Sequence, residues 1–144
     1  MFQRILIAWD GSALAQRALD AAIDLARRYE AELVTISVAN APPDAETAAD
    51  RDESAGAARR YLTETFEAVR DRATGAGVSV EHIVVESADA AGALAGYAHD
   101  HGFDLVVCGH HRSGRAGRLL LRGISDELLR RSSTPLLIVV DDPA

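Results

Sequence analysis

The chain has 144 residues, 48% of them hydrophobic and 26% charged, which is typical of one soluble globular domain. Its net charge of −7 argues against a protein that coats nucleic acid, and no apolar run approaches the roughly 18 residues of a membrane span. A single cysteine excludes an internal disulfide framework, and the first residues carry no signal-peptide pattern. We therefore expect one cytoplasmic domain over residues 1–144, with no nucleic-acid or membrane partner.

The first part of the chain alternates between strand and helix patterns. Residues 4–9 predict a strand, and the continuous apolar run that follows Arg4 indicates that it is buried on both faces. Either Asp10 or Ser12 can cap the helix that follows, because both side chains accept hydrogen bonds from backbone N–H groups. That helix carries apolar residues at a period close to 3.6 as far as Tyr29. Residues 33–38 then predict a second strand.

Residues 40–54 differ from the segments around them. They contain acidic residues and two prolines but no large apolar residue, so we expect a flexible acidic loop, in part helical. A long amphipathic helix follows and stops near Gly75. Residues 78–85 predict a third strand, and Glu81 and His82 within it indicate a position at a sheet edge.

The remaining part of the chain repeats the alternation. Ser87 or Asp89 can cap a third helix, and the wholly apolar run at 105–108, which follows Asp104, predicts a buried fourth strand. A loop rich in Gly, His and Arg follows, and a helix is expected over about 123–131. Residues 136–140 predict the last strand.

Strands that alternate with helices predict an open parallel sheet with helices on both faces, because each crossover is right-handed. We expect a Rossmann-like α/β fold with five strands in the order 3-2-1-4-5. Ligands of such sheets bind beyond the carboxyl ends of the strands, where the strand order reverses. In this chain that crevice would be walled by residues 9–11, by 38–40 and by the loop from Gly109 onward. In the strand order 3-2-1-4-5 the apolar strand Leu136 to Val140 forms the sheet edge opposite the third strand. An exposed apolar edge needs to be covered, so we expect this strand to pair with a second copy of the chain in a homodimer.

The loop after the fourth strand has the layout that α/β proteins use for phosphates, namely strand, glycine-rich turn and helix start. Its arginines recur at three- and four-residue steps, at 112, 115, 118 and 122. On a helical turn they would share one face, where a small anion or an acidic partner could dock. A basic face that only contacts solvent is the alternative. The chain contains no lysine, which excludes a lysine-containing phosphate loop and Schiff-base chemistry.

Three segments together carry a family resemblance. They are Ile-Leu-Ile-Ala-Trp-Asp-Gly-Ser at 5–12, Asp-Leu-Val-Val-Cys-Gly at 104–109 and Leu-Leu-Arg-Arg-Ser-Ser-Thr-Pro-Leu-Leu-Ile-Val at 128–139. In this order they resemble the universal stress protein family over essentially the whole chain. Cys-Gly-His-His at 108–111 is similar to the founding branch of that family. The resemblance implies a homodimer that pairs through its last strand and acts in stress survival rather than in catalysis.

The resemblance also bears on ATP, which many members bind through G-x2-G-x9-G-[ST]. Counted from Gly109, this pattern requires glycines at 112 and 122 and a hydroxyl at 123, where this chain has Arg112, Arg122 and Gly123. An arginine in left-handed geometry loses about 1–2 kcal/mol, and a lost hydroxyl donor subtracts about 0.5–1.5 kcal/mol. We therefore expect no cofactor and no tight ATP site. The alternative is an ATP- or AMP-binding module that keeps its ligand through a shifted loop.

For a bound nucleotide, the resemblance assigns a contact to each matching position. Asp10 would lie near the adenosine and the backbone of Val38 at the adenine edge. Arg112 departs from the pattern, but Arg112 or Arg115 could neutralise phosphate directly. The backbones of Gly109, Gly123 and Ile124 would contact ribose and phosphate. The competing interpretations are a helix cap for Asp10, core packing for Val38, and either base stacking or obstruction for Trp9.

No catalytic residue and no metal ligand is predicted. The serines have no recognisable base nearby in the pattern, so the chain is not expected to be an enzyme, and a slow nucleotide hydrolase is the least supported alternative. Cys108, His110 and His111 lie close together in the sequence, but the side chains of neighbouring histidines rarely bind the same metal ion. A buried Cys108 beside solvent-facing histidines is the better interpretation.

Overall fold

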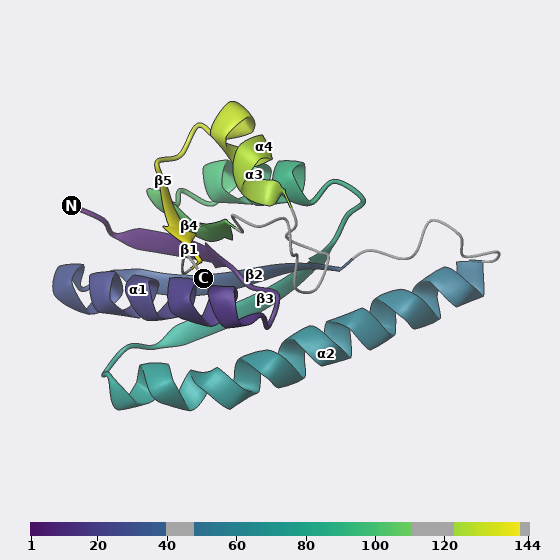
Figure 1. Ribbon diagram of the computed structural model, residues 1–144, viewed down its shortest axis with the longest axis horizontal. Helices are drawn as coiled ribbons and strands as arrows, with labels where there is room; N and C mark the ends of the chain where they lie inside the picture. Colours follow the sequence, from purple (N-terminus) through teal and green to yellow (C-terminus); the bar gives the residue numbers. More distant parts are fainter. Residues whose placement is uncertain (40–47, 111–122, 142–144) are drawn as a thin grey trace.

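The computed structural model describes residues 1–39, 48–110 and 123–141. Five parallel strands form one open sheet in the order β3-β2-β1-β4-β5, as predicted (Figure 1). The elements, in chain order, are β1 (Arg4–Ala8), α1 (Ala13–Tyr29), β2 (Glu32–Ala39), α2 (Ala48–Gly75), β3 (Val80–Glu86), α3 (Ala90–Asp100), β4 (Leu105–His110), α4 (Ile124–Arg131) and β5 (Leu136–Val140). No described helix is long and apolar enough to cross a membrane.

The sheet separates two apolar layers, and the central strand β1 contributes to both. Ile5 and Ile7 pack with buried residues of α1 and α2 on one face. Leu6 and Ala8 pack with buried residues of α3 and α4 on the other face. Because successive side chains of a strand point to opposite faces, a strand covered on both sides must be apolar throughout. The continuous run at the start of the sequence reflects this position.

Helix α1 starts from a side-chain cap and ends in an unusual backbone conformation. The Ser12 hydroxyl accepts a hydrogen bond from Ala15 N at 3.1 Å, so Ser12 is the N-cap. The buried face includes Leu14 and Ala18, as the periodicity predicts, but Tyr29 at its end is 43% exposed. The helix stops at Glu30, which has the left-handed φ of 54° that glycine usually supplies.

Helix α2 includes the second part of the expected acidic loop, which the sequence predicts to be helical in part. It starts at Ala48, so residues 48–54 of the expected acidic loop are helical, whereas 40–47 lie outside the described residues. Alanine has the highest helix propensity, and acidic residues near a helix N-terminus interact favourably with its dipole. The loop was predicted because the segment has no large apolar residues. Their absence indicates that the segment is not packed against a core, but it does not prevent the segment from being helical. Further along, Leu62 and Phe66 are buried against the sheet.

The two edge strands differ in character. Strand β3 lies at one edge, as Glu81 and His82 indicate, and it begins two residues later than expected. Strand β5 lies at the other edge; four of its five residues are half-buried, and Val140 is 37% exposed. An apolar strand at a sheet edge presents unpaired backbone groups beside apolar side chains.

Candidate functional site

The carboxyl ends of the central strands converge where the strand order reverses, between β1 and β4. The end of β1 is fixed to β2 by two hydrogen bonds that involve Trp9: its N–H donates to Ile36 O at 2.9 Å, and the Ser37 hydroxyl donates to its carbonyl at 2.6 Å. Residues that were predicted to contact a nucleotide lie at these strand ends: Val38 and Gly109 are the next-to-last residues of β2 and β4, and Asp10 follows β1. The fold therefore brings Asp10 and Gly109 to the same end of the sheet.

Asp10 is 2% exposed and is not the cap of α1. Its Oδ1 accepts a hydrogen bond from Ser12 N at 2.9 Å, two residues along the chain. This is a turn stabilised by an aspartate side chain, and it orients the serine that does cap the helix. The helix-cap interpretation of Asp10 was therefore wrong in detail, and its contact with adenosine stays a prediction.

Trp9 neither stacks in the crevice nor obstructs it. The side chain is 1% exposed and lies in the core layer under α1 and α2. Its indole Nε1 donates to Thr65 Oγ1 at 3.3 Å, and its ring meets Phe66 edge-on at 6.4 Å between centroids. Trp9 follows Ile5 and Ile7 at a spacing of two residues, so it points to the same face of the sheet as they do.

Val38 and Gly109 have structural roles at this end of the sheet. The Val38 side chain is fully packed in the core under α3 and α4, as the competing interpretation predicts, and the contact of its backbone with adenine stays a prediction. A Cβ on Gly109 would lie 2.6 Å from Leu14 Cγ. The glycine is therefore required for the close approach of α1 to the end of β4, whether or not a phosphate binds beside it.

Among the described residues of the site, the start of α4 has the backbone geometry that best suits a phosphate group. Gly123 is the N-cap, with φ 71°, and makes no side-chain capping hydrogen bond. Ile124 and Ser125 are buried in the first turn. The hydroxyl of Ser125 lies 2.6 Å from His110 Nδ1, so a side chain at the end of β4 is joined to the first turn of α4.

This contact was missed in the sequence analysis, which expected solvent-facing histidines and no base near any serine. His110 is half-buried, and Ser125 lies fifteen residues away along the chain. His111 and Arg112, together with the other arginines of the loop, lie outside the described residues. Cys108 is fully buried, and burial raises the pKa of its thiol to about 11. Among the residues that the structure describes, no three His, Cys, Asp or Glu side chains gather as metal ligands would.

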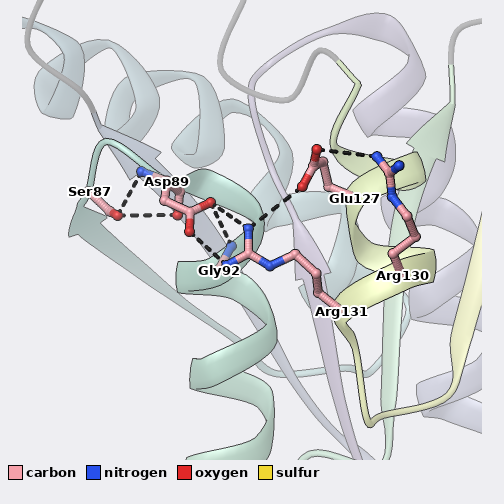
Figure 2. Close-up of polar contacts among 6 residues, drawn as sticks. All are labelled: Ser87, Asp89, Gly92, Glu127, Arg130 and Arg131. Atoms are coloured by element: carbon pink, nitrogen blue, oxygen red, sulfur yellow. Dashed lines mark hydrogen bonds and ion pairs between the residues drawn. The ribbon is translucent and has the colours of Figure 1, made fainter.

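A network of charged groups holds α4 against α3 (Figure 2). Both guanidinium Nη atoms of Arg131 donate to the carboxylate of Asp89, at 2.9 and 2.7 Å. Asp89 also caps α3 by accepting from Gly92 N at 3.1 Å, as the sequence predicts. The hydrogen bonds from Arg131 and from Gly92 lower the pKa of the Asp89 carboxyl. Glu127, one turn before Arg131, lies 3.6 Å from its Nη1 and 3.3 Å from Arg130 Nη2.

The network and the His110–Ser125 contact act on the same short helix. Arg131 fixes the last turn of α4 to Asp89, the N-cap of α3, whereas Ser125 fixes the first turn of α4 to β4. Helix α4, whose start faces the switch point, is thus held by a neighbouring element at each end.

This geometry can be compared with known proteins. The model of the universal stress protein family matches residues 1–140. The chain belongs to the universal stress protein family. Among its relatives, universal stress protein YxiE of Bacillus subtilis is 26% identical over 96% of this chain and 99% of its own. Universal stress protein A of Escherichia coli is 30% identical over 77% of each chain, in agreement with the resemblance to the founding branch.

Solved structures of family members agree with the fold. A universal stress protein from Burkholderia pseudomallei is 29% identical, covers 96% of both chains and superposes with a TM-score of 0.77. A universal stress protein in complex with cAMP is 26% identical over 96% of this chain and 97% of its own, with a TM-score of 0.71. The Rossmann-like architecture is thus that of the family.

Proposed function

We propose that this chain is a non-enzymatic stress-response module that acts as a homodimer in the cytoplasm and does not hold ATP tightly. The start of α4 carries the proposal. Gly123 stands where nucleotide-binding relatives are expected to place a hydroxyl, and the hydroxyl of Ser125, two residues further on, is already bonded to His110. A triphosphate at this helix would have to do without the first hydroxyl and compete for the second.

The absence of turnover is proposed from the surroundings of the two nucleophiles at this end of the sheet. Ser125 is within reach of a histidine base, but its side chain is 2% exposed, so a substrate has no direct access to the hydroxyl. The thiol of Cys108 is buried and stays protonated at neutral pH because burial raises its pKa. Neither group fits an activated nucleophile.

The homodimer is proposed from the edge strand β5. Its outward backbone groups and the exposed Val140 would be covered if β5 paired with its counterpart across a twofold axis. Sedimentation at micromolar protein concentration tests this pairing.

A second candidate is a regulatory module that binds an adenine mononucleotide. It is favoured by the universal stress protein that was solved with cAMP, which is 26% identical to this chain. The first-turn N–H groups of α4 receive no side-chain cap from Gly123, and such a helix start attracts one phosphate group. A monophosphate needs only this contact with the start of α4, whereas a triphosphate also needs contacts with the loop between β4 and α4.

One set of titrations separates the candidates. Purified protein is titrated calorimetrically with ATP and magnesium, with AMP and with cAMP, and each mixture is then analysed for products by chromatography. No heat with any ligand, together with a dimer in sedimentation at micromolar concentration, supports the first candidate. Saturable binding of AMP or cAMP without product supports the second. Tight ATP binding or the release of product contradicts the main proposal.

A further inference from the structure

A groove of about 570 Å³ runs between α2 and the edge strand β3, away from the switch point. One wall is a stripe of α2 residues at helical spacing, and the other wall is five consecutive residues of β3, Val80 to Val84. Five residues of strand extend about 16 Å. The groove therefore follows the strand edge over a length that would accommodate a short extended peptide.

The backbone N–H and C=O groups of alternate β3 residues point away from β2, toward the side on which a ligand could bind. Glu81 O faces β2, where it accepts from the Thr35 hydroxyl at 3.3 Å. Val84 O faces the other way, since Arg59 of α2 donates to it at 3.4 Å. Because consecutive residues of a strand alternate in direction, the N–H and C=O groups of Val80, His82 and Val84 point away from β2. Among the described residues, no strand pairs with them.

His82 borders the groove and has an unused polar atom. Its Nδ1 lies 2.7 Å from the oxygen of the Thr35 hydroxyl. The same hydroxyl lies 3.3 Å from Glu81 O, so it either donates there and accepts from Nδ1–H, or donates to Nδ1. Nε2 is an acceptor in the first case and a donor in the second, and in both it is buried without a partner among the described residues. Buried polar atoms are normally bonded, and a hydroxyl group suits Nε2 in either tautomer because it both donates and accepts; the side chains that cover Nε2 must move aside for an occupant to reach it.

Two ion pairs neutralise four charged groups at the groove. Arg59 lies 3.0 Å from Glu86, and Arg70 lies 3.9 Å from Glu67. Glu81 also lines the groove, but side chains alternate along a strand, so its carboxylate points to the face of the sheet opposite His82. The other walls are Thr63 and aliphatic and aromatic residues, with Phe66 stacked on the His82 ring. An occupant that matches these walls carries no net charge, presents backbone donors and acceptors, and has a side-chain hydroxyl.

We propose that the free edge of β3 is a docking site for an extended, uncharged peptide segment of a partner protein, which adds to the sheet as a sixth strand and directs a threonine or serine hydroxyl toward His82. The peptide backbone pairs with the outward groups of Val80, His82 and Val84, and its alternate side chains lie against α2. The guanidinium of Arg59 bonds to Val84 O in the free protein, and it must move aside when the peptide binds.

The probe is acetyl-Val-Thr-Val-Thr-Val-amide, and its fully N-methylated version is the control, since methylation removes the backbone donors and leaves the side chains. Binding is followed by backbone amide NMR and by hydrogen exchange of the full chain. We expect the exchange of the His82 and Val84 amides to slow at least tenfold with the probe. The Glu81 and Ile83 amides, which already face β2, should change little, and the methylated control should not bind.

Two variants sharpen the test. Val84→Pro removes an outward N–H that β2 does not use, so the fold should persist while the peptide binds at least tenfold more weakly. Arg59→Ala frees Val84 O and should strengthen binding several-fold, which keeps the test informative if the proline variant does not fold.

Three results would overturn the proposal. The first is no binding of the probe at millimolar concentration. The second is protection that falls on β5 or on the switch point instead of on β3. The third is His82 and Val84 amides that are already protected in the free protein and become more so at higher protein concentration, because the edge would then pair with a second copy of the chain.

Discussion

The imidazole of His82 lies flat on the ring of Phe66, with centroids 4.6 Å apart and an angle of 11° between the planes. This contact joins the edge strand β3 to α2, and the Thr35 hydroxyl holds the same imidazole from the sheet side. The stacking buries the ring, and burial lowers the pKa of His82 to about 4. The contact between α2 and the sheet thus depends on a histidine that stays neutral.

Acid should weaken the fold through His82. The unfolded chain takes up the proton near pH 6.5 and the folded chain only near 4, so the free energy of unfolding falls as the pH drops through this window. Since the ring is partly exposed, we expect a loss on the order of 1–2 kcal/mol rather than the full shift. Urea unfolding at several pH values measures it, with His82→Phe as the control. Equal slopes for both proteins between pH 6.5 and 4 would contradict the role of His82.

The ion pair between Asp89 and Arg131 should stabilise the α3–α4 contact. Asp89→Ala removes both the cap of α3 and the carboxylate that Arg131 binds, whereas Asp89→Asn keeps a capping oxygen. We expect both variants to lower the melting temperature, the alanine variant more than the asparagine variant. Arg131→Gln should resemble Asp89→Asn, since each removes one charge from the same pair. If Asp89→Ala melts like the unmodified protein, the network of Figure 2 does not contribute to stability.

Glu30 should be a site at which stability can be gained. Its left-handed backbone at the end of α1 is unfavourable for a residue with a Cβ. Glu30→Gly removes this strain, and after the added freedom of the unfolded chain is subtracted we expect a gain of about 0.5–1 kcal/mol. Glu30→Ala keeps the Cβ and is the matched control. Denaturant unfolding compares the two, and a gain in the alanine variant alone would contradict this explanation.

Gly109 should be required for packing even without a nucleotide. Gly109→Ala places a methyl group against Leu14, which we expect to cost about 1–3 kcal/mol. Leu14→Ala makes room for that methyl group, so the double variant should be more stable than the sum of the two single effects predicts. Thermal unfolding of the four proteins gives the coupling. Additive effects would indicate that Gly109 is needed for another reason.

Much of the fold was predictable because it depends on local periodicity. The apolar run at residues 5–9 marks a strand covered on both faces, and the alternation of strands with helices indicates a parallel sheet with right-handed crossovers, as observed. The start of α2 was not predictable in this way, since its first turns lack the apolar stripe that reveals a packed helix.

The candidate site was only partly predictable. Asp10 follows β1 and Gly109 lies near the carboxyl end of β4, so topology alone places them at one end of the sheet. The contact between His110 and Ser125 joins positions on two sides of a long loop, and no short sequence pattern encodes it. The same is true of Arg131, whose partner Asp89 precedes a different helix. Such contacts depend on how two elements cross, which a single sequence does not specify.

The position of Trp9 has a practical consequence. It is the only tryptophan in the chain, and its indole lies between the end of β1 and the residues Thr65 and Phe66 of α2. Its fluorescence therefore reports whether α2 is seated on the sheet. Emission at short wavelength indicates a closed contact, and a red shift indicates that water has reached the ring. The protein carries an intrinsic optical probe for the detachment of α2, and no label has to be attached.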